Sequence, residues 1–182
     1  MKKILGISII MVVLLATVSF AQFNVSANTK IVVSAGGSFP IEGFSLKSDV
    51  GFGTCIGIEK KIGDNFAFVG AWSHTENGES SGEGIAKGDI FDARCRYYFN
   101  SLNLRFIAVN PYIVFGMGVA RLDWTEDDID PQTILGTATG LGALWKAKDD
   151  LHVFLEGEFL TGGDVVSKII IKGGVAIPVS VF

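Results

Sequence analysis

The feature that most constrains this chain is a two-residue alternation of bulky apolar side chains with small or polar ones. In VGFGTCIGI, residues 50–58, the bulky side chains and Thr54 hold the even positions, and glycine or Cys55 the odd ones. LGTATGLGALW (135–145) and PYIVFGMGVARL (111–122) repeat the pattern. A period of two is typical of β-strands. The 23 glycines would each cost about 1 kcal/mol inside a helix, so the sequence predicts an all-β fold.

The spacing of the alternating segments indicates a barrel. The connections after the first, third and fifth segments are long and polar or flexible, whereas those after the second, fourth and sixth hold short or strand-like material. Long loops on one side and tight turns on the other are typical of outer-membrane barrels, and about ten residues suit a tilted strand that crosses the bilayer. We therefore expect a closed, antiparallel, up-and-down transmembrane β-barrel with eight strands, near residues 30–37, 48–61, 66–76, 88–99, 111–124, 133–146, 151–161 and 168–182.

Charged residues of the segments indicate which face meets lipid. In DIFDARCRYYF, residues 89–99, the charges alternate with apolar side chains, and the segment that starts at Leu151 does the same. An Arg or Lys facing the bilayer midplane costs about 2–4 kcal/mol, so the charged face is expected inside the barrel. Paired, hydrogen-bonded charges can persist there. The predicted ion-pair network of the lumen comprises Glu59, Asp92, Arg94, Arg96, Glu156, Glu158, Lys168 and Lys172. Such a network is either a rigid plug or a narrow polar conduit for ions or protons.

The first residues have the composition of an export signal. MKK is followed by the apolar run ILGISIIMVVLLATVSF and by a small-x-small cleavage site at Ser19-Phe20-Ala21. We predict a signal-peptide helix at residues 1–21 and a barrel domain at residues 22–182; the alternative is an uncleaved membrane anchor. No later apolar stretch reaches the roughly 18–20 residues of a membrane helix. The formal net charge of −4 argues against a nucleic-acid partner.

Aromatic residues fall near the predicted strand ends, where interface belts form. The group expected at the periplasmic rim comprises Tyr97, Phe99, Tyr112 and Trp145. The group expected at the outer rim comprises Trp72, Trp124 and Phe159.

Cys55 and Cys95 are the two cysteines of an exported chain. The alternation places Cys55 inside and Cys95 toward lipid, so their side chains cannot converge as a disulfide requires, and we predict two free thiols.

Several features together resemble the small outer-membrane β-barrel superfamily. They are the export signal, the eight alternating segments, the stretch PYIVFGMGVARL, the stretch GLGALW followed by a short turn and LHVFLEGEFL, and the terminal Phe. Members of this superfamily include the OmpA membrane domain, OmpX and the opacity proteins. The resemblance covers nearly the whole chain after the export signal. It implies a Gram-negative outer-membrane location and contact with outer-membrane lipids, lipopolysaccharide and the barrel-assembly machinery.

In that superfamily the last strand carries the assembly signal, with the order polar, x, Gly, x, x, hydrophobic, x, hydrophobic, often closed by an aromatic residue. The positions that match are Lys172, Gly174, Ile177, Val179 and the terminal aromatic Phe182. Two features depart from the pattern. Phe182 has the opposite parity, and Pro178 cannot donate a ladder hydrogen bond. A bulge at Gly173-Gly174 would reset the parity.

The search for chemistry yields two weak patterns. Some small barrels modify lipid A, and Ser73, His74 and Glu76 near the outer rim would suit ester hydrolysis. Neighbours in a strand point to opposite faces, however, so Ser73 and His74 are not expected to converge. An acidic loop holds Asp123, Glu126, Asp127, Asp128 and Asp130. We expect this loop to be solvated; the alternative is loose binding of Ca²⁺ or Mg²⁺.

These patterns predict a non-enzymatic, monomeric protein of the outer membrane, without cofactor, metal or catalytic residues. Its expected role is structural, or an adhesion- or opacity-like interaction of the extracellular loops with an unidentified surface ligand. One alternative is a small porin-like channel of the OmpW kind for small or apolar solutes. Another is a lipid A-modifying enzyme.

Overall fold

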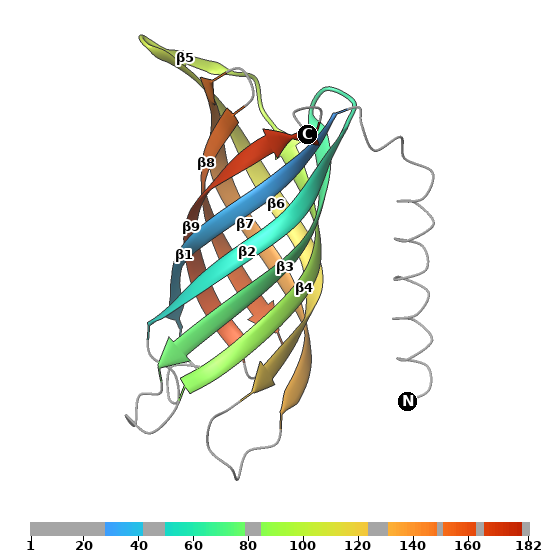
Figure 1. Ribbon diagram of the computed structural model, residues 1–182, viewed down its shortest axis with the longest axis vertical. Coiled ribbons are helices and arrows are strands. Elements are labelled where there is room, and N and C mark those ends of the chain that lie inside the picture. Colours follow the sequence, from blue (N-terminus) through green and yellow to red (C-terminus); the bar gives the residue numbers. More distant parts are fainter. Residues whose placement is uncertain are drawn as a thin grey trace.

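The computed structural model describes residues 28–41, 50–78, 85–123, 131–148, 151–162 and 166–179. The predicted signal-peptide helix lies outside these residues. Every described element longer than a turn is a strand, as the alternation predicts (Figure 1). The strands are β1 (Thr29–Pro40), β2 (Gly51–Ile62), β3 (Phe66–Gly78), β4 (Ile85–Tyr98), β5 (Leu102–Leu104), β6 (Ile107–Asp123), β7 (Gln132–Lys148), β8 (Leu151–Gly162) and β9 (Val166–Pro178).

Eight of these strands form a closed antiparallel ring. Apart from β4 and β5, strands that follow one another in the chain pair with one another. β4 pairs with β6, and β1 pairs with β9 from Lys30↔Pro178 to Pro40↔Lys168. The start of β1 and the end of β9 therefore lie at the same rim, beside the tight β2–β3 turn (Figure 1). In that turn Gly63 has φ +69°, a conformation that costs a residue with a side chain more. The predicted eight-stranded up-and-down barrel is confirmed.

The bulky face of each strand points outward. On β2 the outward row holds Phe52, Ile56 and Ile58, all well exposed, while Gly57 and Glu59 on the opposite face are buried inside. Further exposed large apolar side chains lie on β3, β6, β7, β8 and β9. A surface of this kind is typical of contact with lipid, because a soluble monomer seldom exposes such a large apolar patch. No described helix is long and apolar enough to cross a membrane.

The structure corrects three details of the expected strands. NSLNLRFIAVN, expected as a connection, contains β5 paired with the start of β6, and this hairpin projects beyond the rim (Figure 1). The last strand ends at Pro178 rather than continuing to residue 182, since proline has no N–H for the ladder. Its pairing runs without a register shift through Gly173-Gly174, whereas β7 has an irregularity between Lys146 and Lys148.

Candidate functional site: the charged lumen

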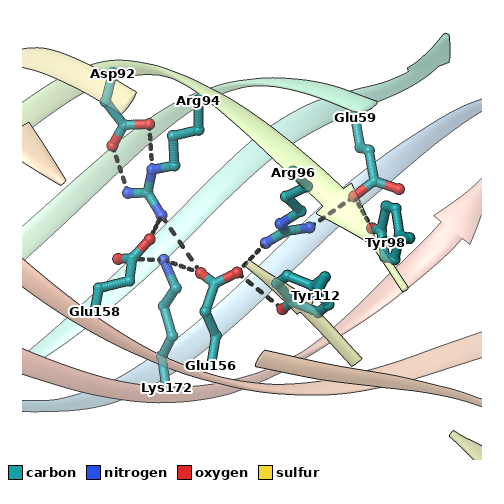
Figure 2. A network of polar contacts seen from close by, with 9 residues as sticks. All are labelled: Glu59, Asp92, Arg94, Arg96, Tyr98, Tyr112, Glu156, Glu158 and Lys172. Carbon is teal, nitrogen blue, oxygen red and sulfur yellow. Dashed lines mark hydrogen bonds and ion pairs between the residues drawn. The ribbon is translucent and has the colours of Figure 1, made fainter. Parts of the chain in front are cut away.

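The inward faces of four strands bring seven of the eight charged residues predicted for the lumen together in the middle of the barrel (Figure 2). Residues two apart on a strand share a face, so Arg94 and Arg96 of β4 both point inward, and so do Glu156 and Glu158 of β8. The remaining members come from β2, β4 and β9: Glu59, Asp92 and Lys172. We call these seven residues the lumen network.

One half of the lumen network is centred on Arg94 and Lys172. Arg94 donates from Nε and Nη2 to the two oxygens of Asp92, at 2.7 and 2.5 Å, and from Nη1 to Glu158. The ammonium of Lys172 lies 2.8 Å from Glu156 Oε1 and 2.9 Å from Glu158 Oε2. The two-point contact between guanidinium and carboxylate fixes the geometry of Arg94 as well as its charge.

The other half is centred on Arg96. Its Nη1 donates to Glu59 Oε2 at 2.6 Å, and its Nη2 donates to Glu156 Oε2 at 2.7 Å. Two tyrosine hydroxyls donate to the same carboxylates, Tyr98 to Glu59 at 2.9 Å and Tyr112 to Glu156 at 2.8 Å. The Arg96 guanidinium also lies 4.9 Å from the centre of the Tyr112 ring, within cation–π range. Glu156 therefore joins the two halves.

The side chains of the lumen network are almost fully buried, and their charges are balanced. The seven side chains of the lumen network expose between 0 and 6% of their surface. With Lys30, which lies 3.7 Å from Glu59, four cations face four carboxylates. Each carboxylate has a cationic partner, which offsets the large cost of burying charge. The result is a dense, electrically neutral plug of side chains.

Cavities lie on both sides of the lumen network. Toward the rim that carries the strand ends, a polar cavity of about 380 Å³ is lined by residues that include Lys30, Asp64, Asn110 and His152. On the other side lie two small cavities, of about 20 and 40 Å³. An apolar cluster packs beside the network: Val32, Ala67, Tyr98, Tyr112, Leu144, Phe154 and Ala176.

Lys168 differs from the expectation. It is buried, with 2% of its surface exposed, but it forms no ion pair with any residue that the structure describes. The physical reason is distance along β9: Lys168 lies four residues from Lys172, which stands opposite Glu156 and contacts both Glu156 and Glu158. The two-residue alternation predicts which face of a strand a side chain occupies, but not how far along the barrel axis it lies.

Three participants were not predicted from the sequence. Lys30 was available as an inward position of β1, and Tyr98 shares the parity of Arg94 and Arg96. Tyr112 was expected in the periplasmic aromatic belt, and that interpretation is wrong: it is buried, 1% exposed, with its hydroxyl on Glu156. Its parity opposite to Ile113 and Phe115 was the signal that could have found it.

A second group of charges lies on the outside of the barrel, next to the long connections. Adjacent outward positions on β3, β4 and β6 hold six residues, which we call the outer band: His74, Glu76, Lys87, Asp89, Arg121 and Asp123. His74 lies 3.0 Å from Asp89, Lys87 lies 3.3 Å from Glu76, and Arg121 lies 3.2 Å from Asp123. These side chains expose between 35 and 64% of their surface.

The remaining candidate residues do not form a reactive site within the described part of the chain. Ser73 is buried and lines an interior cavity, whereas His74 points outward, so the two do not meet. Asp123 ends β6 beside Arg121, and Glu126, Asp127, Asp128 and Asp130 lie outside the described residues. Among described residues, no three acidic, His or Cys side chains are placed to hold a metal ion. Cys55 and Cys95 are both free, as predicted.

The predicted assembly-signal residues lie at and beyond the end of β9. Lys172 and Gly174 point inward, and Ile177 points outward near the rim. Val179 follows the strand directly, and Phe182 lies outside the described residues.

Comparison with known proteins supports the same architecture. No family model matches the chain, and no curated protein matches its sequence. Among solved structures, Neisserial surface protein A superposes with a TM-score of 0.67 at 14% identity, covering 84% of this chain and 97% of that one. The N-terminal β-barrel domain of Pseudomonas aeruginosa OprF superposes with a TM-score of 0.56 at 15% identity, covering 82% and 96%.

The structural neighbours define the fold of this chain. It has the fold of the small eight-stranded outer-membrane β-barrels, with an outward apolar surface. In outer-membrane barrels with an even number of strands, the chain ends and the tight turns lie on the periplasmic side. By this rule the rim with the ends of β1 and β9 is the periplasmic rim, and the outer band lies at the opposite, extracellular rim.

Proposed function

We propose that this protein is a non-enzymatic structural and surface-interaction component of the outer membrane, acting through its extracellular loops and outer rim. The observation that carries the proposal is the lumen network, whose side chains fill the middle of the barrel with at most 6% of their surface exposed. An eight-stranded barrel is only just wide enough for side chains to fill. A filled lumen favours a rigid membrane anchor for the loops over a conduit.

Conductance in planar bilayers tests this proposal. Purified protein, shown to be folded by its different gel mobility with and without boiling, is expected to give no discrete openings. Steady openings would overturn the anchor function and favour the channel alternative, which the periplasmic cavity of about 380 Å³ supports as an entrance. In that event Arg96→Met and Glu156→Gln would change the conductance, while Arg121→Ala on the outside would not.

A second part of the proposal concerns the partner at the outer rim. The outer band lies just beyond the outward apolar rows, at the level where lipopolysaccharide presents phosphates and bound divalent cations. Lys87 and Arg121 offer cations to phosphates, and Glu76, Asp89 and Asp123 offer oxygens to bridging cations. Neisserial surface protein A, a structural neighbour, is by name a surface protein.

Unfolding in two membranes tests the contact with lipopolysaccharide. Lipopolysaccharide in the outer leaflet is expected to raise the midpoint of unfolding relative to phosphatidylcholine alone, and the double variant Lys87→Ala/Arg121→Ala should lose most of this gain. Lys148→Ala, an exposed lysine at the opposite rim, is the matched control and should keep it. An equal gain in all three proteins would refute a role for the outer band.

The proposal includes no catalysis. A hydrolase of the Ser-His-acid type needs its nucleophile and base within hydrogen-bond reach. Ser73 points into the lumen and His74 points away from it, paired with Asp89. Incubation of the protein with purified lipid A, followed by mass spectrometry, is expected to leave every acyl chain in place; loss of a chain would overturn this part.

Export and assembly complete the proposal. Cleavage after Ala21 would leave a mature barrel domain, residues 22–182, and a mature N-terminus at Gln22, which N-terminal sequencing of the membrane-inserted protein checks. We also propose that Lys172, Gly174, Ile177, Val179 and Phe182 are read by the barrel-assembly machinery. The variants Val179→Asn and Phe182→Asn should lower the amount of heat-modifiable protein in cells; normal amounts would refute the assembly signal.

A further inference from the structure

Lys168 is a buried cation without an ion-pair partner among the residues that the structure describes. Only 2% of its surface is exposed, on the inward face of β9 between the lumen network and the extracellular rim. The nearby carboxylate Asp92 has both oxygens bonded to Arg94, and Glu158 is engaged by Arg94 and Lys172. No described residue forms an ion pair with Lys168. A buried ammonium without a partner is costly, so this position calls for an anion from outside the described chain.

The side chain borders a cavity whose walls are otherwise mainly apolar. The cavity has a volume of about 40 Å³, and its inward-facing walls include Ile90, Leu122, Ile134, Ala138 and Leu160. A single water needs about 10–15 Å³ measured in the same way, so the space corresponds to roughly three waters. Such walls offer few hydrogen bonds to water, but they suit a short hydrocarbon chain next to one charge.

We propose that this cavity binds a short aliphatic monocarboxylate, of the size of acetate or propionate, through an ion pair with Lys168. The carboxylate lies against the ammonium, and the carbon chain packs against Leu122, Ile134 and Leu160. A single positive charge matches a single negative one, whereas phosphate would bring up to two charges and three further acceptor oxygens into apolar walls. The cavity belongs to the extracellular side of the lumen network, so the ligand enters from outside the cell.

Methyl NMR spectroscopy can test the site directly. The protein is purified from outer membranes, labelled at isoleucine methyl groups and held in phosphatidylcholine nanodiscs. Sodium propionate is titrated at constant ionic strength. The methyl groups of Ile90 and Ile134 should shift saturably, whereas those of the lipid-facing Ile113 and Ile171 should not. Absence of a saturable shift at Ile90 and Ile134 throughout the titration would overturn the proposal.

Variants of Lys168 test whether its ammonium group binds propionate. Lys168→Met keeps the length of the side chain and removes the charge, and it should weaken propionate binding by about tenfold to a hundredfold, the size of one charge-assisted hydrogen bond. Lys168→Arg should bind within a few-fold of the unaltered protein. Lys87→Met, which removes an exposed lysine near the same rim, is the matched control and should bind normally. Equal affinity in Lys168→Met would overturn the assignment.

Two further ligands test whether the cavity selects a monocarboxylate over a cation or phosphate. Propylammonium, the cationic analogue of similar size, should not shift Ile90 or Ile134, and inorganic phosphate should bind at least tenfold more weakly than propionate. Phosphate binding as tight as propionate would overturn the monocarboxylate assignment. If Lys168→Met does not show the heat-modifiable mobility of a folded barrel, Lys168→Gln replaces it, with the same expected loss.

Discussion

The ion pairs of the barrel form two sets, the lumen network and the outer band. Both join carboxylates to basic side chains, but they differ in burial and in the number of partners that each group has. In the lumen network, side chains expose at most 6% of their surface, and single carboxylates serve several cations and hydroxyls. In the outer band, side chains expose 35% or more and are engaged mainly in simple pairs. Burial raises the cost of losing one partner, because the other is left charged without water.

The difference teaches that the same residue types serve separate purposes in one chain. Exposed pairs contribute about 0–1 kcal/mol each and are screened by salt, so the outer band remains available for other partners. Buried pairs hold the strands of the ring at fixed positions, and they fill the space through which a solute would pass. The following predictions test this contrast through the free energy of unfolding, measured by urea titration in lipid vesicles with tryptophan fluorescence.

The largest effect is expected for Glu156→Gln. Glu156 accepts hydrogen bonds from Arg96 and Tyr112 and pairs with Lys172, so the variant leaves buried cations undercompensated. The free energy of unfolding should fall by about 3–5 kcal/mol. Glu76→Gln in the outer band is the matched control and should leave it nearly unchanged. Similar losses in the two variants would abolish the contrast.

Tyr112→Phe removes one hydroxyl that donates to the lumen network, and it changes little else. It leaves Glu156 with one donor fewer and should lower the free energy of unfolding by about 1.5–3 kcal/mol. Tyr97→Phe on the outward face is the comparison, since Tyr97 contacts the rings of Phe66 and Phe99. We expect it to behave like the unaltered protein. If Tyr112→Phe is as stable as Tyr97→Phe, the hydroxyl does not support Glu156.

Gly142→Ala tests packing around the lumen network rather than its charge. A Cβ atom at this position of β7 would overlap the ring of Tyr112. Overpacking a filled interior costs about 1–3 kcal/mol, and the loss should disappear in the double variant with Tyr112→Ala. Gly157→Ala, with open space at its Cβ, is the control. Its stability should be unchanged or higher, and a loss equal to that of Gly142→Ala would contradict the explanation.

The smallest effect is expected for Arg121→Ala. Arg121 is 64% exposed and lies 3.2 Å from Asp123 on its own strand. In phosphatidylcholine vesicles its loss should change the free energy of unfolding by no more than about 0.5 kcal/mol. A loss above about 2 kcal/mol would place the outer band in the same energetic class as the lumen network.

Strand alternation accounts for most of what could be predicted from the sequence. A side chain in a β-strand has only two faces to choose from, so the lipid cost of charge is enough to assign Arg94, Arg96 and Glu156 to the inside. The same rule places Cys55 and Cys95 on opposite faces. These inferences need no knowledge of the neighbouring strand.

Depth within the barrel could not be predicted, because it depends on the stagger between strands. Glu156 stands opposite Lys172 on β9, whereas Lys168 stands opposite Leu160, four residues further along. Both lysines fit the two-residue alternation equally well, so the alternation carries no information about the pairing register between β8 and β9. NSLNLRFIAVN was expected only as a connection of short or strand-like material, and the separate strand β5 was not predicted, because three paired residues are too few to form a periodic pattern.

The ring closes between β1 and β9, the first and last barrel strands in chain order. This seam gives β9 two roles in the finished barrel. Without β9, Glu158 and Glu156 would lack Lys172, and the ladder edge of β1 would be open. Closure of the wall and neutralisation of the lumen therefore depend on the same strand.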